Sequence, residues 1–483
     1  MQSRRDQVQA YFFVVGRLVS ALMRARTDEP APPHRRFGTG FFGGVLLAAL
    51  ISAGFGVYGL IVPSGNDSWR AAGTIIVEEE TGARYLYLDG LLHPVLNYAS
   101  ARLAVNDARG QVSQVSQRSL EGVPRGVPIG IPNAPDSLPA AADMTDGPWL
   151  SCASTTTDEA GQDRPATTLL VAGPGGITLA DGEGLLVVGP DDQTHLVWQG
   201  RKYRFPDGTI AAALGYDTVT PLRVTTSWIN ALPTGPDLGP PEVEGIGEPT
   251  APIGNSPGVV GQIYQVDNPV IDATEFYVLR RDGLAAVSPT MASLALASPA
   301  TATAYPAGGV RPIAIGPEAL AGAPRSSAPI AGTDHPNTPP TLVDLDGSAS
   351  VRPCVRFTLG STDGPDIAVS MVDRDTVDGP VSPARGTEAG SADRVLVPPN
   401  SGVLVRDLPA PGVDGGTHYL VTDLGVKYPL ASTQVAATLG YGGSRSVPVP
   451  GELLAALPTG PVLDPEQAIR PRQPVPPQSE GDN

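Results

Sequence analysis

The most continuous apolar stretch of the chain lies near its start. Residues 41–62 are 22 residues without a charged side chain, and at 1.5 Å per residue they cover the roughly 30 Å hydrocarbon core of a bilayer. Two arginines directly precede the stretch and Asp67 follows it, and excess positive charge marks the cytoplasmic side of a span. The pattern predicts one transmembrane helix with residues 1–40 in the cytoplasm. A cleaved signal peptide is the alternative, but it has a shorter apolar region and a small-residue cleavage site.

A second apolar pattern precedes the span and has the period of an amphipathic helix. Its apolar positions are Val8, Tyr11, Phe12, Val15, Leu18, Val19 and Leu22. Arg17 and Arg24 lie on another face of the predicted helix. Two interpretations stay open, namely a helix lying on the inner leaflet with its arginines near lipid phosphates, and a helix that docks to a cytoplasmic partner.

Small residues recur at every fourth position of the predicted span. They are Gly40, Gly44, Ala48, Ser52 and Gly56. A stripe of this kind lets a second helix approach closely. The span is rich in small residues throughout, so the alternative is that the stripe reflects composition alone.

Beyond the span, one short pattern occurs four times, twice closely and twice more loosely. An alternating apolar run meets a glycine turn, a second short strand ends near a proline, and a short helix follows. The turn glycines are Gly90, Gly200, Gly283 and Gly425. In the two close copies the unit ends in Leu-Pro-Thr-Gly-Pro, at 232–236 and 457–461, which we expect to stop it because proline denies further helix or ladder bonds.

The repeats and the segments between them predict an α+β, β-rich fold with an elongated exterior. Units this small need neighbours to bury their apolar faces, so we expect a central β domain flanked by repeat pairs. The predicted division is a cytoplasmic helix and linker at 1–40, the transmembrane helix at 41–62, the first repeat at 63–140, the central domain at 141–190 and 341–410, the second repeat at 191–240, the third at 262–325, the fourth at 411–465 and a disordered tail at 466–483.

The chain contains only two cysteines, and both belong to strand-like segments of the predicted central domain. Cys152 and Cys354 are separated by 202 positions in the sequence. Outside the membrane the compartment is oxidising, so disulfides persist there. The sequence favours a bond between them, with two free buried thiols as the alternative.

Charge and motif content argue against nucleic-acid binding and against catalysis. The chain has a formal net charge of -17, which disfavours phosphate backbones. The Gly-x-Ser-x-Gly match around Ser256 fails as a nucleophile elbow because Pro257 has no backbone N–H for an oxyanion. No histidine pair has metal-ligand spacing, and neither lysine, Lys202 or Lys427, belongs to a phosphate-binding loop. We therefore expect no catalytic residue, no metal and no cofactor.

Taken together, these motifs resemble the EccB family, a core membrane component of the actinobacterial type VII (ESX) secretion system. The resemblance rests on the opening at 3–11, on the single span, on residues 81–97 and 100–103, on the two cysteines and on the Leu-Pro-Thr-Gly-Pro repeats. It implies a single-pass inner (plasma) membrane subunit that assembles with the EccC motor ATPase, with EccD and EccE, and near the mycosin protease. We also expect a homo-oligomer within that larger complex.

Three functions compete at this stage. The first is a structural subunit of the secretion machinery, in which single charges such as those of His195, His418, Lys202 and Lys427 tolerate replacement. The second is an extracytoplasmic ATPase, because members of the family are described as ATPases, although no residue here matches an ATP-binding motif. The third is a cell-wall-binding module, because small repeated units often bind repetitive polymers.

Overall fold

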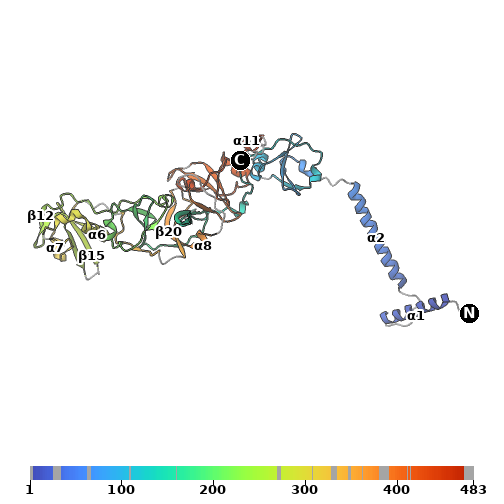
Figure 1. Cartoon of the computed structure of the whole chain (residues 1–483), viewed down its shortest axis with the longest axis horizontal. Coiled ribbons are helices and arrows are strands. Elements are labelled where there is room, and N and C mark those ends of the chain that lie inside the picture. Colours follow the sequence, from blue (N-terminus) through green and yellow to red (C-terminus); the bar gives the residue numbers. More distant parts are fainter. Residues whose placement is uncertain are drawn as a thin grey trace.

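In the computed structural model the chain forms two N-terminal helices and an elongated, strand-rich exterior (Figure 1). The structure describes residues 4–24, 34–61, 67–107, 110–158, 160–268, 273–306, 308–327, 334–345, 350–361, 363–379, 391–410, 412–413 and 415–472. Helix α1 spans Arg4–Arg24 and helix α2 spans His34–Ile61. The predicted end of the span at residue 62 lies outside the described residues.

Each of the four repeats has the same topology, which is three antiparallel strands, a helix and a fourth strand. The first strand pairs antiparallel with the second and parallel with the fourth, giving the spatial order third, second, first, fourth. Repeat 1 contains β1 (Ile75–Glu78), β2 (Arg84–Leu88), β3 (Leu91–Pro94), α3 (Tyr98–Val105) and β4 (Val112–Val115). Repeat 2 contains β8 (Glu183–Val188), β9 (Thr194–Trp198), β10 (Arg201–Arg204), α4 (Thr209–Ala213) and β11 (Leu222–Arg223).

The other two repeats follow the same plan. Repeat 3 contains β14 (Ile263–Asn268), β15 (Ala273–Arg280), β16 (Gly283–Val287), α6 (Pro289–Ala297) and β17 (Ile313–Ala314). Repeat 4 contains β22 (Gly402–Leu408), β23 (His418–Thr422), β24 (Lys427–Pro429), α9 (Thr433–Thr438) and β25 (Val447–Pro450). A short helix follows the fourth strand in each, namely η2 (Gln117–Leu120), α5 (Thr226–Asn230), α7 (Pro317–Gly322) and α10 (Gly451–Ala455).

The central domain is a six-stranded sheet in the order β21-β6-β5-β19-β20-β7. Its strands are β5 (Trp149–Thr157), β6 (Asp163–Leu170), β7 (Ile177–Thr178), β19 (Val351–Thr358), β20 (Asp366–Asp373) and β21 (Arg394–Leu396), with α8 (Arg374–Val377) after β20. The remaining elements are η1 (Asp67–Arg70), η3 (Ala141–Asp143), β12 (Pro249–Ile253), β13 (Ser256–Val259), η4 (Pro299–Ala304) and β18 (Thr341–Leu342). Both halves of the chain therefore contribute strands to one sheet.

Shared apolar cores fix the order of the units along the exterior. One core joins the central sheet to repeats 2 and 4, for example through Trp149, Trp228 and Leu453. A second core joins repeats 1 and 4, and a third joins repeats 2 and 3. The resulting order is repeat 1, repeat 4, centre, repeat 2, repeat 3, with repeat 3 farthest from α2 in Figure 1.

The first repeat of each half of the chain packs on a repeat of the other half. Repeat 1 precedes the first central strands but packs on repeat 4, and repeat 3 precedes the later central strands but packs on repeat 2. The same hydrogen bond occurs at both junctions: the Tyr441 hydroxyl donates to the Pro139 carbonyl at 2.8 Å, and the Tyr216 hydroxyl donates to the Pro340 carbonyl at 2.7 Å. The sequence repeat is thus also a repeat of packing.

The predicted division of the chain differs from the structure at its boundaries. The segments 183–188 and 402–408 were expected in the central domain, but they are the first strands of repeats 2 and 4. A two-stranded hairpin leaves one sheet edge unpaired, and a preceding apolar strand occupies it. Repeats 2 and 4 therefore begin about one strand earlier than predicted.

The prediction that Leu-Pro-Thr-Gly-Pro denies further ladder bonds is wrong. In repeat 2 the Lys202 amide donates to the Pro233 carbonyl at 3.0 Å, and the Gly235 amide donates back to the Lys202 carbonyl at 2.8 Å. The equivalent pair of bonds links Lys427 to the closing segment of repeat 4. Proline lacks an N–H but keeps its carbonyl acceptor, so the motif extends the sheet by one parallel bridge.

The prediction of a disordered tail from residue 466 is wrong for its first residues. Helix α11 (Pro465–Ala468) packs on α3, and the Arg472 guanidinium donates to the Gly130 carbonyl at 2.9 Å. Ala468 is fully buried in the core that repeats 1 and 4 share. The segment is proline-rich, yet it fastens the end of repeat 4 to repeat 1. Residues 473–483 lie outside the described residues.

Candidate functional site

The membrane anchor is the apolar part of α2. Residues 38–57 form the only described helix that is long and apolar enough to cross a bilayer. The stripe positions Gly40, Gly44 and Gly56 are exposed, and a Cβ atom added at any of them would meet nothing within 4 Å. The face is therefore open to a second helix, and its role in packing stays a prediction.

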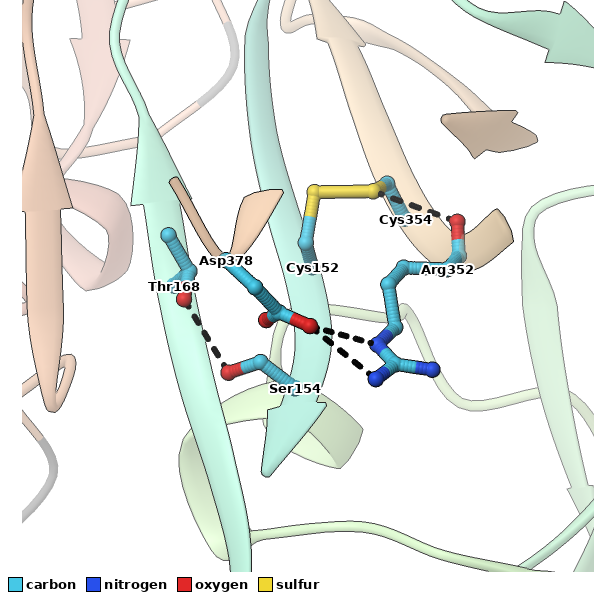
Figure 2. Close-up of a disulfide and its surroundings, with 6 residues drawn as sticks. All are labelled: Cys152, Ser154, Thr168, Arg352, Cys354 and Asp378. Atoms are coloured by element: carbon cyan, nitrogen blue, oxygen red, sulfur yellow. Dashed lines mark hydrogen bonds and ion pairs between the residues drawn. A yellow bond between two sulfur atoms is a disulfide. The ribbon is translucent and has the colours of Figure 1, made fainter. Parts of the chain in front are cut away.

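The disulfide at the centre of the exterior is present, as the sequence predicts (Figure 2). Cys152 of β5 and Cys354 of β19 are directly opposed in the antiparallel register of the two central strands. Both side chains are fully buried, in a small core on the face of the sheet away from repeats 2 and 4. The bond ties the first half of the chain to the second at the place where their strands pair.

Polar contacts surround the disulfide on that face. The Arg352 guanidinium donates to the Asp378 carboxylate at 3.0 Å, and Arg374 contacts the same carboxylate at 3.3 Å. The Ser154 and Thr168 hydroxyls, drawn in Figure 2, bond to each other at 3.0 Å. The arrangement pairs charges and hydroxyls with one another, and it fixes α8 to the sheet.

The four predicted turn glycines all adopt positive φ. The angles are 84° at Gly90, 70° at Gly200, 134° at Gly283 and 74° at Gly425. Residues with a Cβ rarely adopt this region. At Gly200 a Cβ atom would also overlap the carbonyl oxygen of Ile367 in β20, so this turn is pressed against the central sheet.

The two lysines occupy equivalent repeat positions and have structural partners. The Lys202 ammonium donates to the Ile229 carbonyl at 2.9 Å, at the end of α5. The Lys427 ammonium donates to the carbonyls of Leu454 and Leu457 at the end of α10. Because the Lys427 side chain is only 8% exposed, its charge is expected to matter for folding, and the prediction that it tolerates replacement needs correction.

The two equivalent histidines also lie at strand starts and make local hydrogen bonds. His195 Nδ1 is 3.2 Å from the Gln193 carbonyl, and His418 Nδ1 is 3.1 Å from the Ser446 hydroxyl. Burial lowers the pKa of both imidazoles. The partner of His195 is a backbone carbonyl and the partner of His418 is a serine hydroxyl, and both partners belong to the same repeat unit as their histidine.

The Gly-x-Ser-x-Gly segment and the acidic and histidine side chains were the sequence's candidates for a nucleophile and a metal site. Ser256 begins a strand of the β12–β13 hairpin and is exposed, so no strand-to-helix elbow presents it. Within the described ranges no group of three His, Cys, Asp or Glu side chains is arranged to hold a metal.

A nucleotide would require a phosphate cradle built on a cation. Both lysine ammonium groups donate to carbonyl oxygens at helix ends, and no glycine-rich loop precedes either of them. The lysines of this chain therefore do not fit the role that a lysine has in a phosphate-binding loop.

Comparison with known proteins gives the family directly. A family model described as type VII secretion system ESX-1, transport TM domain B, matches residues 1–477. The chain belongs to the EccB family. It is therefore a membrane subunit of a type VII secretion system and a single-pass inner-membrane protein.

Relatives and solved structures cover nearly the whole chain. It is 28% identical to the ESX-3 secretion system ATPase EccB3 of Mycolicibacterium smegmatis, over 96% of this chain and 90% of that protein. It is also 28% identical to the ESX-2 secretion system ATPase EccB2 of Mycobacterium tuberculosis, over 98% and 96%. A similar fold occurs in an intact ESX-5 inner membrane complex, with a TM-score of 0.66 and 24% identity over 100% of this chain and 98% of that one. Another occurs in an EccB3 dimer from the ESX-3 core complex, with a TM-score of 0.62 and 25% identity over 82% of this chain and 99% of that one.

Proposed function

We propose that this member of the EccB family is a structural subunit, whose exterior is a rigid spacer between the inner membrane and more distant parts of the secretion machinery. The observation that carries the proposal is a single anchor followed by repeats that share continuous cores and one central disulfide. Its repeated residues are glycines and prolines that shape backbone. Proton transfer and nucleophilic attack need ionisable or hydroxyl groups held by a base.

The proposed orientation places α1 in the cytoplasm and residues 63–483 outside. Arginines concentrate before the span, and positive charge is retained on the cytoplasmic side. The test is labelling of spheroplasts with a membrane-impermeant thiol reagent, because the native cysteines are bonded to each other. A cysteine placed at exposed Thr459 should react, and one placed at Gln9 should react only after lysis. The reverse result would overturn the orientation.

The proposed partners are EccC-like, EccD-like and EccE-like membrane subunits and a mycosin protease, with more than one copy of this chain in the complex. The similar solved structures are of an intact inner membrane complex and of a dimer, which supports assembly of this kind. The test is affinity purification of the full chain from membranes in mild detergent. Recovery with the EccC-like secretion ATPase is expected, and a monodisperse lone monomer would contradict the proposal.

The proposal includes no nucleotide site. Purified full-length chain in detergent is titrated with ATP and Mg²⁺, and binding is followed by calorimetry. No saturable binding is expected, since both lysines are committed to helix ends. Saturable binding that Lys202→Met or Lys427→Met abolishes in a folded protein would overturn this part of the proposal.

A further inference from the structure

A pocket opens in the middle of the exterior, between repeats 2 and 4. Its volume is about 790 Å³, within the range of about 300–1,000 Å³ that is usual for small-molecule sites. Its floor is the central sheet, including Thr167 and Phe357, and its walls are α5 with the following Leu-Pro-Thr segment on one side and α10 on the other. Three separate units of the fold therefore meet at this one hollow.

The two walls are equivalent in the repeat, yet they differ in the polar side chains that face the pocket. Positions 225 residues apart correspond, as Lys202 and Lys427 do. Asn230 of α5 corresponds to Ala455 of α10, and Glu452 of α10 corresponds to Ser227 of α5. The departures from the repeat thus give one wall an amide and the other wall a carboxylate.

Lys202 is available to the pocket in a way that its counterpart is not. Its ammonium donates to the Ile229 carbonyl at 2.9 Å and to Asn230 Oδ1 at 3.2 Å, and an ammonium has three donors. Lys202 is half-buried and lines the pocket, whereas Lys427 is buried beneath α10. The exposed Glu452 carboxylate on the opposite wall attracts the Lys202 charge.

The rest of the lining is apolar, which defines the ligand. It includes Leu169, Phe357, Ile367, Leu232 and Leu453, together with prolines and alanines. One cation and one carboxylate balance each other, so a polyanion such as a nucleotide is disfavoured in this pocket. A ligand that suits it carries one negative group, one positive group and apolar side chains between them.

We propose that this pocket binds short apolar peptides through both of their free termini. The peptide carboxylate accepts from the Lys202 ammonium and the Asn230 amide, its ammonium group pairs with Glu452, and its side chains cover the apolar floor. Such peptides arise outside the membrane from proteolysis of exported proteins. This site goes beyond the structural role proposed above and does not depend on it.

The test is calorimetric titration of the full chain in mild detergent with the tripeptide L-Ala-L-Leu-L-Ala. Saturable binding is expected, and acetylating the amine or amidating the carboxylate should each weaken it by about tenfold or more, since each removes a charged partner. No saturable binding, or equal binding of the capped and free peptides, overturns the proposal.

Two variants assign the termini to their side chains. With Lys202→Met the free acid and the amide should bind equally, and with Glu452→Gln the free and acetylated peptides should bind equally. Glu121→Gln, an exposed change in repeat 1, is the matched control and should bind as wild type does. Glu452→Gln removes no hydrogen bond within the described chain, so it tests the site without disturbing α10. An unchanged preference for both free termini in these variants would refute the assignment.

Discussion

Removing the central disulfide is the perturbation for which the structure gives the clearest expectation. The double variant Cys152→Ala/Cys354→Ala leaves the pairing of β5 with β19 in place but opens the covalent link between the two halves. The residues enclosed by the bond include all of repeats 2 and 3. The variant should therefore fold to the same architecture with lower stability.

The size of the effect follows from the length of the closed loop. The sequence separation is 202 residues, for which the loop-entropy relation gives about 5 kcal/mol at 25 °C. Loss of sulfur packing at two fully buried sites adds about 1 kcal/mol. With a denaturant slope of about 2–3 kcal/mol per molar, the urea midpoint should fall by roughly 2 M.

The assay is equilibrium urea unfolding of the full chain in detergent, followed by tryptophan fluorescence. Trp149 lies in β5 opposite Phe357 and is fully buried, so its emission reports on the central sheet. Wild type unfolded with a reductant present should match the double variant, because both routes remove the same link. A variant within about 1 kcal/mol of oxidised wild type would refute the loop argument.

Three further changes have expected outcomes. Lys427→Met should lower the free energy of unfolding by about 1–3 kcal/mol, because buried helix-end carbonyls lose their donor, and Lys202→Met, at the more exposed equivalent, should cost less in the same urea titration. Gly44→Leu should reduce recovery of the assembled complex while Val45→Leu should not, and equal recovery would mean that the small-residue stripe has no packing role. Burial holds the pKa of His195 below its ordinary 6.5, so the unfolded chain binds the proton more readily and the free energy of unfolding falls as pH drops below about 6.5. Between pH 7.5 and 5 the free energy of unfolding should fall less for His195→Gln than for wild type. Identical pH dependence of the two proteins would contradict this.

Local sequence patterns predicted the local parts of this fold. The predictions of the apolar span and of the turn glycines need only neighbouring residues, and the prediction of the disulfide needs only the compartment. The structure contains a long apolar helix, positive φ at the four turns and the Cys152–Cys354 disulfide. The first strands of repeats 2 and 4 were assigned to the central domain, because a strand such as 183–188 looks alike in either sheet. Only long-range pairing decides between the two sheets.

Side-chain partners were harder to predict than strands. Lys427 looks like an ordinary exposed charge in a hairpin, and only the return of the closing segment brings the carbonyls of Leu454 and Leu457 to its ammonium. The pocket beside Lys202 was missed for the same reason, since its walls come from repeats that are 225 residues apart. A signal was present in the sequence, because aligning the repeats shows Asn230 and Glu452 without counterparts.

Because the first repeat of each half packs on the other half, small repeats form one continuous elongated exterior. Had repeat 1 packed on repeat 2 and repeat 3 on repeat 4, only the central sheet and its disulfide would join the two halves. Instead every neighbouring pair in the order repeat 1, repeat 4, centre, repeat 2, repeat 3 shares a buried core. Tyr216 and Tyr441 fasten the two exchanged junctions to the segments that lead into the centre. A displacement of repeat 3 relative to repeat 1 would therefore have to break a buried core, and this supports the proposal that the exterior is a rigid spacer.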